Sequence, residues 1–194
     1  MKNGYGIYKW PDGASYEGSW IDNKINGFGI YKWADGRMFT GEWVNCKTGG
    51  FGVYNWTDGR RYEGFFTKDK RQGYGTLMTP NNYTYSGGWL NGKQHGYGFI
   101  YTDKNEFKYG MWYNGVKLVK LTRSQATEVQ EGRMDLYSTI KAKGIHDPVQ
   151  YWQDIALLTN KFEPFDSFQT EQGIFELKQS HMMEQFEDLK VVLK

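Results

Sequence analysis

The chain has few residues of the types that carry out chemistry, and their spacing does not form a catalytic or metal-binding motif. The three histidines, His95, His146 and His181, lie far apart in the sequence, and none has a neighbour at the spacing of a metal ligand or an activated nucleophile. The Gly-x-Gly triplets are not followed by the helix that a nucleotide-binding loop requires. We therefore predict a non-enzyme with no catalytic, cofactor-binding or metal-binding residues and no cofactor.

Three carboxylates recur at a constant interval, Asp12, Asp35 and Asp58, each 23 residues after the last. Paired carboxylates can serve as general acid and base. Each of these aspartates, however, precedes a glycine, and Asp-Gly is a strong signal for a tight hairpin turn. We interpret them as turn residues.

Lysines also recur every 23 residues, and an arginine follows the third of them. These cations are Lys24, Lys47, Lys70, Arg71 and Lys93. A row of cations can attract acidic lipid head groups, so these residues are candidates for a lipid-facing edge. The alternative is that the lysines protect an exposed sheet edge. A net charge of +2 is too small to indicate a polyanion, so we expect no nucleic-acid partner.

The elements that carry these residues follow from an internal repeat. Triplets of glycine, aromatic residue and glycine begin every 23 residues, five times without an insertion. They begin at Gly4, Gly27, Gly50, Gly73 and Gly96. The ring 12 residues after each start is Tyr16, Phe39, Tyr62 and Tyr85, and the fifth copy departs from the pattern with Lys108.

Each unit consists of two aromatic-rich runs around a turn, which is typical of a β-hairpin. The units are 4–26, 27–49, 50–72, 73–95 and a degenerate 96–118, and segments such as 21–26 are expected to link the hairpins. Alternation places glycines and rings on one face, so we expect each ring to cover the glycine of its own or the next hairpin. The predicted fold is mainly β with an α-helical C-terminal tail: an elongated, single-layer antiparallel sheet of five stacked 23-residue β-hairpin repeats.

The last unit differs on the opposite face, where polar positions have become apolar. The residues are Phe99, Tyr101, Phe107, Tyr109 and Met111. Residues 119–194 show helix signals instead of the repeat, including Thr122 and Gln125 as a capping box and Asp147-Pro148 at a second helix start. We predict that this helical extension docks on the array through that patch, or that the patch binds a partner.

The repeat resembles the MORN (membrane occupation and recognition nexus) repeat, whose pattern is carried here by "YEGSWIDNKINGFG" (16–29), "FTGEWVNCKTGGFG" (39–52), "YEGFFTKDKRQGYG" (62–75) and "YSGGWLNGKQHGYG" (85–98). The resemblance implies a non-catalytic scaffold, of the kind found in ciliary radial-spoke heads and protist cytoskeletal rings. The function expected from it is a subunit of a ciliary axonemal or other cytoskeletal assembly. The alternative is a phosphoinositide- or membrane-associated adaptor.

The expected partners are other proteins of a large assembly, with a homo-oligomer and a weak contact with acidic lipid left open. Candidate contact residues are the mid-array rings Trp33, Trp43, Tyr54 and Trp56, since Trp and Tyr dominate interface hot spots. The same rings could instead be needed only to hold the sheet. One cysteine, Cys46, and no apolar run of membrane-spanning length or signal peptide lead us to expect a cytoplasmic, ciliary or cytoskeletal location.

Overall fold

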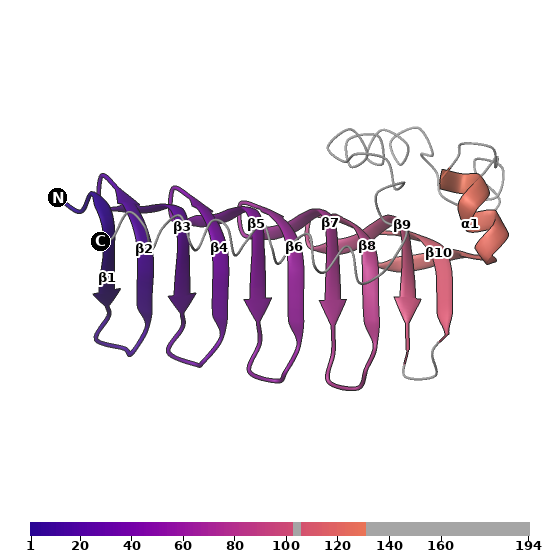
Figure 1. Ribbon diagram of the computed structural model, residues 1–194, viewed down its shortest axis with the longest axis horizontal. Coiled ribbons are helices and arrows are strands. Elements are labelled where there is room, and N and C mark those ends of the chain that lie inside the picture. The colour runs from indigo at the N-terminus through magenta and orange to yellow at the C-terminus, as the bar shows by residue number, and fades with distance from the viewer. Residues whose placement is uncertain (103–105, 131–194) are drawn as a thin grey trace, which may run out of the picture. The chain divides into compact units, whose positions relative to one another are not determined.

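The computed structural model describes residues 1–102 and 106–130, and these form one antiparallel sheet followed by a short helix (Figure 1). Eleven strands pair in sequence order, so every strand lies beside its neighbours in the chain. The strands are β1 (Gly4–Lys9), β2 (Ser15–Ile21), β3 (Lys24–Lys32), β4 (Met38–Val44), β5 (Lys47–Asn55), β6 (Arg61–Thr67), β7 (Lys70–Met78), β8 (Thr84–Leu90), β9 (Lys93–Tyr101), β10 (Phe107–Tyr113) and β11 (Val116–Leu121). The predicted mainly β fold of stacked hairpin repeats is confirmed.

The aspartates at constant spacing are turn residues, as predicted. The amide of Gly13 donates to the carbonyl of Trp10 at 3.0 Å, and the Asp12 carboxylate accepts from the amide of Ala14 at 2.9 Å. Gly13 has a φ of 94°, which explains why glycine follows the aspartate. In the fourth turn Asn82 takes the glycine position with a φ of 56°. The fifth turn includes residues outside the described ranges.

The segments expected to link the hairpins are themselves two-residue turns, so the sheet is a continuous meander. Asp22 and Asn23 have φ values of 48° and 64°, which is the type I′ geometry that matches the twist of paired strands. We call the turns 22–23, 45–46, 68–69, 91–92 and 114–115 the I′ turns. The second residue of each donates its amide to a backbone carbonyl 21 residues earlier, at 2.8 to 3.2 Å. The repeats are therefore joined laterally at this end of the strands.

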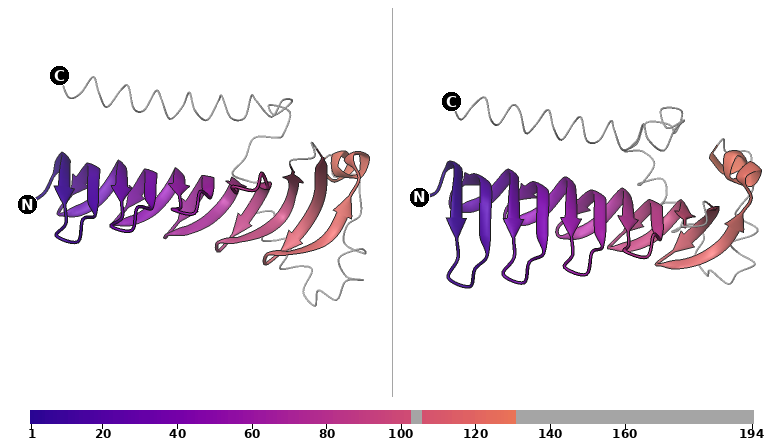
Figure 2. Two further views of the ribbon diagram at one scale, coloured as in Figure 1. Left: turned by 90° about the horizontal axis from the view of Figure 1, so that it is seen from below. Right: turned by 60° about the horizontal axis from the view of Figure 1, so that its bottom comes forward.

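A bulge recurs where each even strand meets the next odd strand. In the pair β2–β3, Gly18 lies opposite Gly29 and Trp20 opposite Ile25, so Ser19 alone faces three residues of β3. Gly27, the first glycine of its triplet, lies in this bulge with a φ of 84°. Bulges bend a strand and increase its twist. The bulges therefore help to curve the sheet, and the curved strands can be followed in Figure 2.

The second glycine of every triplet after the first has a different role, since a ring lies on it. A Cβ on Gly18 would lie 2.5 Å from the hydroxyl of Tyr16, and a Cβ on Gly29 would lie 2.5 Å from Cζ of the same ring. Tyr16 thus covers a glycine of its own hairpin and one of the next, as expected. Phe39, Tyr62 and Tyr85 repeat the arrangement, and all four rings are fully buried. We call Tyr16, Phe39, Tyr62 and Tyr85 the covering rings. With Trp20, Trp43, Phe66, Trp89 and Trp112 they form the core of the sheet.

Phe39 lacks a hydrogen bond that the other covering rings make. The hydroxyls of Tyr16, Tyr62 and Tyr85 donate to the carbonyls of Ser19, Phe65 and Gly88 at 3.1 to 3.3 Å. We predict that Phe39→Tyr adds the equivalent bond to Glu42 and raises the free energy of unfolding by about 0.5–1 kcal/mol. Urea denaturation measures it, and Tyr62→Phe as the reciprocal control should lose a similar amount. A destabilised Phe39→Tyr variant would contradict the equivalence of the four units.

The array continues beyond the fifth hairpin. Strand β11 pairs with β10 and runs through residue 118, where the sequence places the end of the array. Helix α1 (Arg123–Gln130) follows. The amide of Gln125 donates to the Thr122 hydroxyl at 3.2 Å, and the amide of Thr122 donates to the Gln125 side chain at 2.9 Å. This is the predicted capping box, whereas the helix start predicted at Asp147-Pro148 lies outside the described residues.

Candidate functional site

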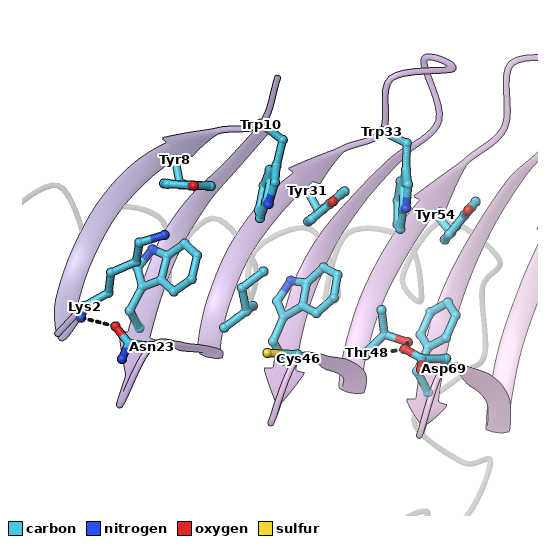
Figure 3. Close-up of a pocket in the computed structure, with 14 residues that line it drawn as sticks. Lys2, Tyr8, Trp10, Asn23, Tyr31, Trp33, Cys46, Thr48, Tyr54 and Asp69 are labelled. Carbon is cyan, nitrogen blue, oxygen red and sulfur yellow. Dashed lines mark hydrogen bonds between the residues drawn. The ribbon is translucent and has the colours of Figure 1, made fainter. Parts of the chain in front are cut away.

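The glycine-and-ring face forms a groove that crosses hairpins one to three. Its volume is about 630 Å³. Figure 3 shows that the strands curve around this face, so the rings lie on its concave side. The lining side chains are Lys2, Tyr8, Trp10, Trp20, Asn23, Ile25, Tyr31, Trp33, Trp43, Cys46, Thr48, Tyr54, Phe66 and Asp69. Because the lining repeats with the hairpins, the groove presents similar chemistry at each step.

One wall of the groove belongs to a continuous row of six rings, which we call the ring ladder; its last ring, Trp56, lies just past the groove lining. The ladder consists of Tyr8, Trp10, Tyr31, Trp33, Tyr54 and Trp56, and the centroids of successive rings are 4.8, 5.2, 4.7, 5.3 and 4.5 Å apart. All six rings keep part of their surface exposed. In the fourth hairpin Leu77 and Thr79 occupy the positions of Tyr54 and Trp56, so the ladder ends there.

The floor of the groove consists of larger, buried rings. Trp20, Trp43 and Phe66 are only 5–6% exposed. The indole N–H of Trp20 donates to the carbonyl of Gly6, and that of Trp43 donates to Gly29, both at 3.4 Å. Each of these indoles also packs edge-on against a covering ring, such as Tyr16 on Trp20 at 5.2 Å. The floor is therefore part of the structural core.

The other wall follows the I′ turns and is polar. The Asp69 carboxylate accepts from the amide of Thr48 at 2.8 Å and from its hydroxyl at 3.4 Å. The ammonium of Lys2 lies 3.1 Å from the ring centroid of Tyr8 and 4.7 Å from that of Trp20. The groove thus places hydrogen-bonding groups opposite an aromatic wall and a cation against the first rings of that wall and of the floor.

An exposed ion pair braces the ladder in the second and third hairpins. Burial raises the pKa of the Tyr31 and Tyr54 hydroxyls. Arg37 donates to Asp35 at 2.7 Å and to the Tyr54 hydroxyl at 3.1 Å, and its guanidinium lies 5.4 Å from the ring centroid of Trp33. The hydrogen bond from the Arg37 amide, aided by its side chain, holds the pKa of the Asp35 carboxyl below its usual value. Arg37, beside an Asp-Gly turn, thus holds the ladder rings Trp33 and Tyr54 in their orientation.

The model of the MORN repeat family matches residues 1–15, 16–36, 39–60, 62–82 and 85–105 of the chain. These matches cover more than half of the sequence. The chain belongs to the MORN-repeat family. MORN repeats are non-catalytic interaction repeats that mediate protein–protein or membrane/lipid interactions, and the chain is a repeat protein of the interaction-scaffold type. A comparison with curated proteins found no significant match.

The MORN array places the four rings proposed for partner contact at different depths. Trp33 and Tyr54 line the groove with part of their surface exposed, while Trp43 is on the buried floor. Trp56 packs on Tyr54 at the end of the ladder. Sequence reasoning left out Tyr8, Trp10 and Tyr31, although they occupy the repeat positions of Tyr31, Trp33 and Tyr54. The 23-residue register was the signal that could have found them.

The lysines of the MORN array lie beside the I′ turns, at one end of the sheet. Each is the exposed first residue of its strand, β3, β5, β7 or β9. Arg71 does not belong to this row. Its guanidinium lies 4.1 Å from the ring centroid of Trp89 and donates to the carbonyl of Gly92 at 2.7 Å. Burial lowers the pKa of Arg71, and its contacts place it on the groove face.

The apolar residues of the last MORN hairpin lie together on the outer face, opposite the groove. The ring centroids of Tyr101 and Phe107 are 4.9 Å apart, and those of Phe99 and Tyr109 are 6.0 Å apart. Met111, on the same face, is only 1% exposed. Docking of the C-terminal extension on this patch stays a prediction, because residues 131–194 lie outside the described ranges.

Two findings concern other classes of site, and both hold only for residues 1–102 and 106–130. No group of three or more histidine, cysteine, aspartate or glutamate side chains there could hold a metal ion. In the same part of the chain, no helix has the length and apolar character needed to span a bilayer.

Proposed function

We propose that this MORN array is a scaffold that acts without catalysis and that its groove binds a segment of another protein. The observation that carries this proposal is the ring ladder, six partly exposed Tyr and Trp rings in a row above a buried floor. Tyr and Trp supply large contact areas with few rotatable bonds and carry much of the binding energy at protein interfaces. The covering rings and the floor form the buried core, and the ladder rings pack on that core while keeping part of their surface exposed.

The assembly we propose is ciliary or cytoskeletal, with the protein in the cytoplasm or the cilium. Support comes from the resemblance of the array to MORN proteins of radial-spoke heads and cytoskeletal rings. The partners are other proteins of that assembly, and a second copy of this chain is the alternative occupant.

The proposal predicts that partner binding depends on the ladder rings of the groove. In a pull-down from ciliated cells, Trp33→Ala is expected to reduce capture of the partner at least tenfold, since hot-spot truncations cost about 2 kcal/mol or more. Val44→Ala is the matched control, because Val44 is an exposed residue beside an I′ turn on the outer face. Circular dichroism of both variants checks that the sheet is intact. Equal capture by the two variants would contradict the proposal.

A second candidate function is adhesion to acidic membranes through the end of the sheet that carries the I′ turns. Ile21 and Val44 are 53% and 55% exposed there, and they pair across the turns with Lys24 and Lys47. Exposed aliphatic side chains beside cations can enter a head-group layer while the ammonium groups contact its phosphates. The same lysines also suit the protection of a sheet edge.

Liposome flotation separates these two roles of the lysines. If the membrane function holds, vesicles with phosphoinositide will retain the protein, and Lys24→Glu with Lys47→Glu will abolish retention. Each lysine near an acidic surface contributes about 1 kcal/mol, so the double reversal should cost well over tenfold in affinity. Lys9→Glu with Lys32→Glu, at the opposite end of the strands, provides the control. Equal retention on neutral vesicles would leave edge protection as the role of the row.

A further inference from the structure

The groove offers hydrogen-bond donors in a regular row, and this feature limits what can occupy it. Trp10 and Trp33 are equivalent residues one repeat apart, and their indole rings lie parallel in Figure 3. Neither indole N–H forms a hydrogen bond within residues 1–102 and 106–130, unlike the indoles of the floor. Two strands of a sheet span about 9.6 Å. The ladder therefore repeats a free donor and a pair of rings at about this interval.

The repeat distance matches one regular backbone conformation. A polyproline II segment has three residues per turn and a rise of 3.1 Å per residue, so its repeat is about 9.3 Å. Its carbonyls form no internal hydrogen bonds, and proline has no N–H that would need an acceptor. Aromatic-lined grooves bind such segments because their rings pack against the flat faces of proline. An α-helix fits less well, since its backbone carbonyls are already bonded and would leave the indole donors unpaired.

Two cations on the groove face set the chemistry of the residues that flank the bound segment. Lys2 and Arg71 occupy the same repeat position, three repeats apart. Lys2 contacts the floor indole of Trp20, and Arg71 contacts the buried indole of Trp89, past the groove lining. Neither cation forms an ion pair within the part of the chain that the structure describes. Three repeats span about 29 Å, which is the length of about nine residues of polyproline II. Asp69, the acidic residue among the lining side chains, is engaged by Thr48.

We propose that the groove binds a proline-rich segment of its partner in the polyproline II conformation, with acidic residues about nine positions apart at its two ends. This inference rests on the proposed function, since it names the chemistry of the segment that the groove receives. The prolines pack on the exposed surface of the ladder rings, and carbonyls three residues apart accept from the indoles of Trp10 and Trp33. The acidic ends pair with Lys2 and Arg71.

The test uses the full chain and a synthetic peptide, Glu-Pro-Pro-Ala-Pro-Pro-Ala-Pro-Pro-Glu. Nuclear magnetic resonance of the ¹⁵N-labelled protein follows the indole N–H signals, and calorimetry gives the dissociation constant. The peptide should move the Trp10 and Trp33 signals and bind at least tenfold more tightly than the same peptide with alanine at every proline. Equal binding of the two peptides, or unmoved indole signals, would overturn the inference.

Two variants measure separately the contribution of the indole hydrogen bond and that of the cation to binding of the peptide. Trp33→Phe keeps a ring but removes the N–H, so it should weaken the peptide by about threefold to tenfold, the effect of one hydrogen bond. Tyr5→Phe is the matched control and should leave affinity unchanged, because it also keeps a ring and removes one donor, but Tyr5 bonds to Glu17 and does not line the groove. Lys2→Gln should weaken the acidic peptide by about threefold and a glutamine-ended version not at all. Equal loss in Trp33→Phe and Tyr5→Phe would contradict the role of the donor.

Failure of this inference can be told apart from failure of the proposed function. If the proline peptide does not bind while capture of the native partner still depends on Trp33, the groove takes a segment of another conformation, such as an amphipathic helix. The inference is then overturned and the proposed function stands. If neither the peptide nor the partner depends on Trp33, both are overturned.

Discussion

Gly52→Ala is expected to destabilise the array by about 2–3 kcal/mol, because a methyl group there would enter the ring of a fully buried side chain. A Cβ on Gly52 would lie 2.6 Å from Cε2 of Phe39 and 3.1 Å from the carbonyl oxygen of Thr40. Phe39 has no exposed surface toward which it could move, and it also contacts Trp43 and Phe66. Urea denaturation followed by tryptophan fluorescence measures the change.

The chain supplies a matched control for this substitution. Gly6 occupies the same position in the first triplet, but no atom lies within 4 Å of a Cβ built there. Gly6→Ala should therefore be neutral, or stabilise by a few tenths of a kcal/mol (at most about 1) through the unfolded chain. An equal loss of stability in both variants would show that the glycines are required for backbone conformation, and the ring-on-glycine account of the core would be wrong.

Trp43→Ala is expected to cost about 3–5 kcal/mol, the usual loss for a large aromatic residue removed from a core. Trp43 is 5% exposed, and its ring contacts those of Tyr16, Tyr31 and Phe39. Loss of partner binding in this variant would follow from unfolding. Thermal unfolding monitored by circular dichroism should show a large decrease in Tm.

Trp33→Ala provides the comparison for Trp43→Ala, because Trp33 is on the wall of the groove and Trp43 is on its buried floor. Trp33 is partly exposed and contacts two ladder rings, Tyr31 and Tyr54, so its removal should cost only about 1–2 kcal/mol of stability. Its effect on binding should be the larger one. If the two variants lose equal stability, the ladder is part of the core and its role as a docking wall loses its main support.

The sequence predicted the features that depend on local chemistry and on the repeat period. Asp-Gly turns, the alternation of faces and the pairing of rings with glycines follow from turn preferences and from the two-residue period of strands. The capping box of Thr122 and Gln125 was also visible, because it involves residues three positions apart.

Other features depend on how strands meet and could not be predicted from one unit. The two glycines of a triplet look alike in the sequence, yet Gly27 permits the bulge while Gly29 lies under the ring of Tyr16. The curvature that makes a groove arises from the bulges between strands. Arg71 follows Lys70 in sequence but points to the opposite face, where Trp89 holds it. The sequence also did not show how deeply each ring is buried, since Trp33 and Trp43 are the same residue type in the same unit.

The central claim is that the groove, and not the outer face or the end that carries the I′ turns, receives the partner. Site-specific photo-crosslinking in the native assembly tests it most directly, with a benzophenone-bearing residue in place of Trp33 in one variant and of Val44 in another. The account predicts a crosslinked partner from position 33 and none from position 44. A partner crosslinked from position 44 alone would contradict it.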